Sequence, residues 1–152
     1  MSNFSTIFDQ LVDTTIPALT GFSSKKQLVD PYNLEENDIN LLRNGWGIRI
    51  GDAEDSPFQE FKFTRVIQEI SIVLTREVKA TEHNKTPLET ATKALIEDAV
   101  SMRVDFYNAD QLTLDSNIEN IVFNSRSGVE FIDETNVVFT VVSFNFEIKE
   151  TI

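Results

Sequence analysis

Residues 65–76 read Arg65-Val66-Ile67-Gln68-Glu69-Ile70-Ser71-Ile72-Val73-Leu74-Thr75-Arg76, and this stretch decides the fold. Apolar and polar side chains alternate along it, which predicts a β-strand from about Phe61 to Val78. Strands usually have about five or six residues, so we expect one this long to project past its sheet or to bend through a bulge. One face is apolar, with Val66, Ile70, Ile72 and Leu74, and the other carries Glu69, Ser71, Thr75 and Glu77.

A helix is predicted after this strand. Thr86-Pro87-Leu88-Glu89 has the pattern of a capping box with proline at the first helical position, so we expect the helix to begin there. Apolar residues then recur every three or four positions and form one stripe for packing against a sheet. The stripe consists of Leu88, Ala91, Leu95, Ala99, Met102 and Phe106.

The N-terminal part predicts a helix over residues 4–19, which Pro17 ends or bends, and then a loop. A short helix over residues 34–43 is expected to start with Asn33 as its cap, with Ile39 and Leu42 facing inward. A short strand over residues 46–51 then leads into an acidic turn over residues 52–57.

Three further strands are predicted near the C-terminus. Residues 124–128 have the length and glycine content of a hairpin turn between strands at 118–123 and 129–132. The last strand covers residues 137–149, with Phe144, Phe146 and Ile148 facing inward. Short links between consecutive strands favour antiparallel pairing. The sequence therefore predicts an α+β fold, a mostly antiparallel sheet with helices packed on one face, and its 152 residues fit a single domain over 1–152.

Composition excludes several classes of function. There is no cysteine, so disulfides, thiolate zinc sites, iron–sulfur clusters and cysteine nucleophiles are absent. With 25 acidic and 13 basic residues the formal net charge is −12, and such a surface repels nucleic-acid phosphates and anionic lipid. This charge serves solubility, or it provides a surface that nucleic acid passes without binding. We expect no signal peptide, no membrane span and no membrane partner.

Few residues suit catalysis or cofactor binding. His83 lies in a polar segment before the helix, where an exposed histidine is expected. Ser23 and Lys26 have the spacing of a serine–lysine enzyme, but the companion motifs of those enzymes are missing. Gly45-Trp46-Gly47 lacks the third glycine and the following helix of a dinucleotide site, so we interpret its glycines as providing backbone freedom beside a bulky tryptophan.

Asp52, Glu54 and Asp55 have the spacing of part of a calcium loop, although the central glycine and the closing glutamate are missing. A solvated acidic turn explains them as well. The chain has carboxylates enough for a hydrolytic pair, but nothing singles out one pair. We therefore expect no catalytic site, no cofactor and no metal.

The layout resembles the tail-terminator (tail-completion) proteins of long-tailed bacteriophages, the group that includes the terminator of phage lambda. The resemblance covers residues 4–149 as a pattern of elements. It is carried by the strand at 65–76 leading to a helix, by the closing strand Val138-Phe139-Thr140-Val141-Val142-Ser143-Phe144-Asn145-Phe146-Glu147-Ile148, and by Asn33-Leu34-Glu35-Glu36-Asn37 with Asn44-Gly45-Trp46-Gly47-Ile48-Arg49-Ile50-Gly51.

The resemblance implies a structural protein of the virion, made in the host cytoplasm, that forms a ring of itself, usually of six copies. Such a ring caps the tail-tube protein, ends tail polymerisation and joins the tail to the head-completion or connector protein, while DNA passes through without tight binding. Asp52, Glu54 and Asp55 are then candidates for the lumen or a ring face, and Glu69, Ser71, Thr75 and Glu77 for subunit contacts. The alternatives are another head–tail connector or tail-tube subunit, or a small ligand-binding or enzymatic α+β domain.

Overall fold

The computed structural model describes residues 2–56, 63–79 and 86–151. Its helices are α1 (Asn3–Gln10), which continues into a π-helical turn (Leu11–Thr15), α2 (Ile39–Leu42) and α3 (Thr86–Tyr107), with short 3-10 turns at Leu34–Glu36 and Ala109–Gln111. Its strands are β1 (Lys26–Gln27), β2 (Asn44–Asp55), β3 (Phe63–Glu77), β4 (Ile118–Arg126), β5 (Glu130–Phe131) and β6 (Val137–Thr151).

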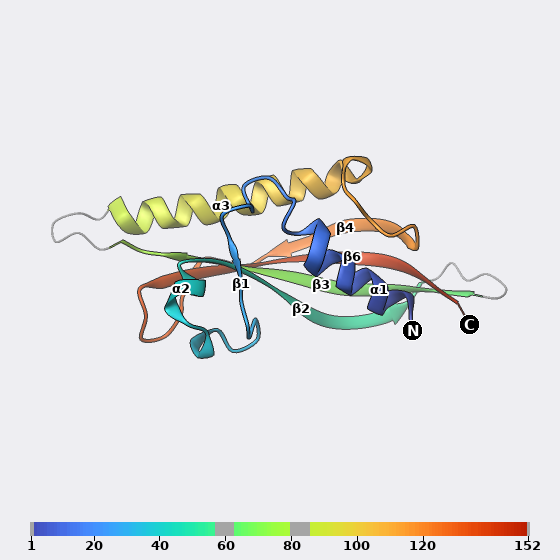
Figure 1. The fold of residues 1–152 in the computed structure, drawn as a ribbon, viewed down its shortest axis with the longest axis horizontal. Coiled ribbons are helices and arrows are strands. Elements are labelled where there is room, and N and C mark those ends of the chain that lie inside the picture. Colours follow the sequence, from blue (N-terminus) through green and yellow to red (C-terminus); the bar gives the residue numbers. More distant parts are fainter. Residues whose placement is uncertain (1, 57–62, 80–85, 152) are drawn as a thin grey trace.

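The strands form one twisted sheet in the order β1-β2-β3-β6-β4, and β5 also pairs with β6 (Figure 1). The pairs are antiparallel apart from the short β1–β2 pair, which is parallel. β3 and β6 pair along their whole lengths, from Phe63 opposite Thr151 to Glu77 opposite Val137. The two longest strands therefore form the centre of the sheet, and the predicted α+β architecture is confirmed.

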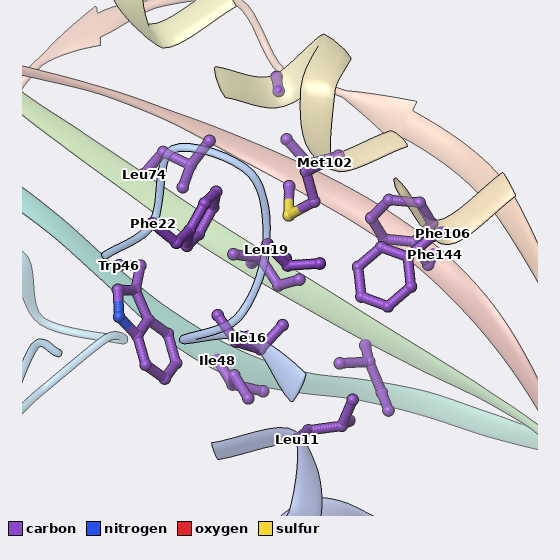
Figure 2. Close-up of a cluster of buried hydrophobic side chains, with 14 of the residues drawn as sticks. Leu11, Ile16, Leu19, Phe22, Trp46, Ile48, Leu74, Met102, Phe106 and Phe144 are labelled. Carbon is purple, nitrogen blue, oxygen red and sulfur yellow. The ribbon is translucent and has the colours of Figure 1, made fainter. Parts of the chain in front are cut away.

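The larger part of the core lies between the sheet and the helices α1 and α3, which cover the same face. Alternate β3 residues Ile70, Ile72 and Leu74 point into it, as Leu95 of α3 does, and all four are at most 1% exposed. Figure 2 shows Trp46 and Ile48 of β2 in the same layer as labelled side chains of the N-terminal segment and of α3. We call this side of the sheet the helix-covered face.

A smaller cluster covers one half of the opposite face. There Val73 of β3 and Val137 of β6 pack against Leu28, Leu34 and Leu42, which belong to the segment that contains α2. The long helices thus share one face as predicted, whereas short helical pieces cover half of the other.

Gly45 and Gly47 allow this segment to lie directly on the sheet. A Cβ atom at Gly45 would come within 2.5 Å of the carbonyl oxygen of Leu41, and one at Gly47 within 2.7 Å of the Cβ of Pro31. Positive φ is recorded at Gly21 and not at these two glycines. Close approach of the chain, and not backbone freedom beside Trp46, therefore requires glycine at both positions.

Several local predictions for the first half of the chain are wrong. The side chain of Asn33 makes no capping bond, and α2 is capped by Asp38, which accepts from the N–H of Asn40. Ile39 is 42% exposed and Leu88 41%, although Leu42 and the rest of the α3 stripe are buried as predicted.

The predicted hairpin at 124–128 is also wrong. β4 and β5 both pair with the same edge of β6, β4 opposite residues 142–148 and β5 opposite Val138 and Phe139. They follow one another as an interrupted strand, so the glycine at 128 marks an irregularity and not a reversal. The chain reverses instead between β5 and β6, where Glu134 has a φ of 62°.

Candidate interaction surface on the bare half of the sheet

The face of the sheet opposite to the helix-covered face is uncovered toward the end of β2. We call this uncovered part, which includes Asp52, Glu54 and Glu69, the bare half of the sheet. A depression of about 240 Å³ lies there, and four strands contribute to its lining. β2 provides Asp52, Ala53 and Glu54, β3 provides Ile67 and Glu69, and β4 and β6 provide Asn124 and Asn145. Because three of these residues are carboxylates and two are amides, the surface is polar and acidic.

A β-bulge in β2 positions the β2 carboxylates. The register shifts between Ile50, opposite Ile70, and Ala53, opposite Gln68. The bulge therefore places two β2 residues opposite Glu69 on one face. The segment predicted as an acidic turn is thus the bulged end of a strand.

Gln68 holds the bulge in place. Its side chain is 9% exposed and lies on the helix-covered face, opposite to the depression. The amide nitrogen donates to the carbonyl oxygens of Gly51 at 2.9 Å and Glu69 at 3.0 Å. These bonds satisfy carbonyl groups that the irregular pairing leaves without a ladder partner.

Among the described residues, Arg65 brings positive charge to the border of this surface. Arg65 lies 3.9 Å from Glu147 and 3.7 Å from Glu119. Within residues 2–56, 63–79 and 86–151, no ion pair is recorded for Asp52, Glu54 or Glu69. The bare half therefore presents a net negative field to solvent.

Arg49 marks the boundary between the covered and bare halves. Its side chain donates from Nε to the carbonyl oxygen of Pro31 at 2.6 Å, and its strand neighbour Ile50 donates its N–H to the hydroxyl of Tyr32 at 2.7 Å. Burial lowers the pKa of the Arg49 guanidinium, since desolvation disfavours the charged form. The segment at 28–42 is thus fastened to β2 where the bare surface begins.

The structure separates the residues predicted to make functional contacts. Asp52 and Glu54 lie together with Glu69 in the depression, and Asp55 is exposed beyond it. Glu77 lies toward the other end of β3, where Arg43 binds it at 3.2 Å. The single polar surface expected along the whole of β3 is therefore confined to its first half.

Ser71 and Thr75 are buried, so the outward position predicted for them on the polar face of β3 is wrong. Ser71 is 6% exposed and its hydroxyl lies 2.7 Å from that of Ser143 on β6. Thr75 is fully buried and accepts from the N–H of Gly45 at 3.1 Å. Both were expected outside because polar alternation does not reveal that the segment at 28–42 covers this part of the face.

Sequence reasoning missed the partners that β4 and β6 bring to the depression. Asn145 stands opposite Glu69 and Glu147 opposite Ile67 in the β3–β6 register. The outward position of Asn145 and Glu147 is visible in the alternation of the last strand. Which strand lies beside it is not, because that depends on pairing between segments about 75 residues apart in sequence.

In the described ranges no group of three or more histidine, cysteine, aspartate or glutamate side chains is arranged to hold a metal ion. His83 lies outside the described residues. None of the helices that the structure describes is both long and apolar enough to cross a membrane.

No family model matches the sequence, and no curated protein matches it. Among solved structures, a chain of the virion of a native gene transfer agent particle is similar to this one, at 12% sequence identity over 94% of this chain and 91% of that chain, with a TM-score of 0.42. A similarity at this level assigns neither a family nor a function.

Proposed function

We propose that this chain is a structural virion protein that forms a closed ring on the end of a phage tail tube, ends tail polymerisation and joins the tail to the head. The observation that supports this most directly is the bare, acidic half of the sheet, where Asp52, Glu54 and Glu69 face solvent together. The pattern of elements that resembles tail terminators supports it as well.

An acidic sheet face suits the lumen of a ring through which DNA moves. Phosphates are repelled by carboxylates at distances within the Debye length, about 8 Å at physiological ionic strength. A lumen lined by basic residues would instead bind DNA through release of counterions. The net charge of −12 has the same sign as this face, so the whole ring would repel DNA that is not threaded through it.

In this proposal the chain has no catalytic residue, cofactor or metal. Its partners are further copies of itself, usually six in a ring, the tail-tube protein on one side and a head-completion or connector protein on the other. Its location is the tail or neck of the virion. A closed ring requires two different patches on each subunit whose contacts close by rotation.

The proposal is tested by native mass measurement across concentration together with electron microscopy of the purified chain. Closed rings with a central hole, and no shift of duplex DNA at physiological salt, are the expected result. Open filaments would favour a tail-tube subunit instead. A chain that remains monomeric at high concentration and forms no rings would overturn the proposal.

A further inference from the structure

A second surface lies on the opposite edge of the sheet, between β4 and the C-terminal half of α3. It is a groove of about 380 Å³, and most of its lining is apolar. The lining residues are Arg103, Phe106, Tyr107, residues 120–123 and Phe144.

Several large apolar or aromatic side chains in and beside the groove are exposed. In the groove, Tyr107 is 90% exposed and Val122 51%. On the outer side of α3, Val100 is 54% exposed and Val104 51%. Aromatic and apolar side chains left in solvent together commonly mark an interaction site.

The groove is positively charged within an acidic protein. Arg103 lines the groove, with its guanidinium 3.9 Å from the ring centre of Phe123, and the exposed Arg126 ends β4 outside the lining. No carboxylate contributes to the lining of the groove in the described part of the chain. Glu119, at the start of β4, is directed to Arg65. A segment with apolar character and negative charge therefore fits this surface.

Both outer edges of the sheet offer strands for pairing. β4 ends the strand order on one side. On the other side β1 pairs with β2 only at Gly45 and Trp46, so the outer edge of the rest of β2 pairs with no strand among the described residues. At the outer end of β2, Asp55 stands opposite Val66 on the helix-covered face, the side on which the groove lies, and its charge is opposite to that of the groove.

Strand direction permits these two edges to pair between copies. β2, β3, β6 and β4 alternate in direction across the sheet. β4 of one copy is therefore antiparallel to β2 of a neighbour whose sheet faces the same way. Such a contact uses two different patches, as a ring requires.

We propose that the groove between α3 and β4 receives the acidic end of β2 from a second copy of this chain. The proposal rests on the ring proposed above and names the contact that builds it. Within one sheet, Ile118, Ile148, Val66 and Asp55 lie opposite one another on neighbouring strands. If two copies paired with these residues aligned, Glu119 of one copy would lie beside Glu54 and Asp55 of the other. Like charges disfavour that register, so the neighbour is displaced along the strand, with its Asp55 toward Arg126.

The deciding experiment exchanges charges between two variants. Arg126→Glu and Asp55→Lys each place like charges in every contact of a ring made from one variant. Each variant alone should need about tenfold more protein to assemble, the change expected from about 1.4 kcal/mol of lost contact energy. An equimolar mixture should assemble at the wild-type concentration, because alternating copies restore opposite charges at each contact. Lys93→Glu, on an exposed position of α3 away from the groove, is the matched control and should assemble as the wild type does.

A second measurement checks the direction of the contact. The chain has no cysteine, so Asp55→Cys combined with Arg126→Cys introduces a defined pair, whose two members lie near opposite ends of β2 and β4 within one chain. Oxidation should give a ladder of cross-linked species beyond the dimer, whereas each single variant should give at most dimers. Products of the double variant that end at the dimer would overturn the head-to-tail contact.

The outcomes separate this contact from the ring itself. Wild-type rings that both charge variants form equally well would overturn the contact and leave the ring in place. A wild-type chain without rings would overturn both. Circular dichroism of each variant shows that it is folded before its assembly is compared.

Discussion

The ammonium nitrogen of Lys25 lies 2.7 Å from a carboxylate oxygen of Asp98, and the lysine side chain has no exposure to solvent. The same ammonium donates to Asn44 at 2.6 Å, and the same carboxylate oxygen accepts from Arg76 at 3.1 Å. This buried cluster connects the segment after α1 with the start of β2, the end of β3 and the middle of α3. It therefore fastens the N-terminal segment over the edge of the core.

Replacing Asp98 should destabilise the fold severely. Asp98→Asn leaves a buried ammonium without its counter-charge, and such a change costs roughly 3–5 kcal/mol of unfolding free energy. Denaturant titration followed by circular dichroism measures it. Lys25→Met is the comparison, because Asp98 then retains Arg76, and its cost should be clearly smaller. Equal costs would contradict this account of the cluster.

The stability that Lys25 contributes should rise with pH. Burial lowers the pKa of its ammonium below the ordinary value of 10.5, although the hydrogen bond and the charge of Asp98 oppose that shift. Between the lowered pKa and 10.5 the unfolded chain binds more protons than the folded chain, so the folded state gains stability as pH rises through this window. The difference in unfolding free energy between wild type and Lys25→Met isolates the effect, and it should move in favour of the wild type toward pH 10.5. A difference that falls over this range would show that the ion pair outweighs desolvation.

Gly45→Ala should lower the unfolding free energy markedly, although it adds only one methyl group. The new methyl group would lie 2.5 Å from the carbonyl oxygen of Leu41, a backbone atom that cannot move aside alone. Overpacking of this kind costs about 1–3 kcal/mol. Gly128→Ala is the matched control, because nothing lies within 4 Å of its added carbon. A midpoint of denaturation unchanged in both variants would argue against close packing of the 28–42 segment on the sheet.

The apolar stripe of α3 predicts that two of its leucines contribute very differently to the unfolding free energy. Leu95 is fully buried among β3 and β6 residues, so Leu95→Ala should cost roughly 2–5 kcal/mol. Leu88→Ala, at a position 41% exposed in the first turn, should cost well under half of that. Thermal and denaturant unfolding of the two variants measure the difference. Similar losses would mean that the first turn is packed more tightly than its exposure indicates.

The long strand, the long helix and the last strand were predictable because period and length are local properties of the sequence. β3 and α3 begin and end close to the predicted residues, and Ile70, Leu95 and Phe144 lie in the core as their spacing indicates. The twisted sheet follows from these elements with few alternatives. Fold class was therefore accessible from the sequence alone.

The candidate surface was only partly predictable, because it depends on long-range pairing. The alternation of β3 identifies Glu69 as polar and outward, but the same pattern assigns Ser71 and Thr75 to the same surface. The difference arises from Gly45 and Gly47, which let a loop cover half of the face. Asp52 and Glu54 reach the bare half because β2 has a bulge, which the side-chain amide of Gln68 stabilises by a hydrogen bond. No sequence pattern predicts this hydrogen bond.

The bare half of the sheet should govern how rings behave toward DNA. Replacing Asp52, Glu54 and Glu69 with lysine changes the charge of this surface by six units in each subunit, and this should convert repulsion into retention of duplex DNA at physiological salt. Basic surfaces bind DNA with a strong salt dependence, so retention should weaken steeply between low and high salt. Electrophoretic mobility and sedimentation of the assembled variant with DNA measure it.

The control carries the same change of charge on the helix-covered side, with Asp9, Glu89 and Glu97 replaced by lysine at exposed positions of α1 and α3. If the bare half lines the lumen, electron microscopy of the first variant should show DNA held within the ring, and the control should hold it only on the outside. DNA bound by both variants in the same way would place the bare half on an outer surface. DNA bound by neither would show that this charge does not determine how the ring meets DNA.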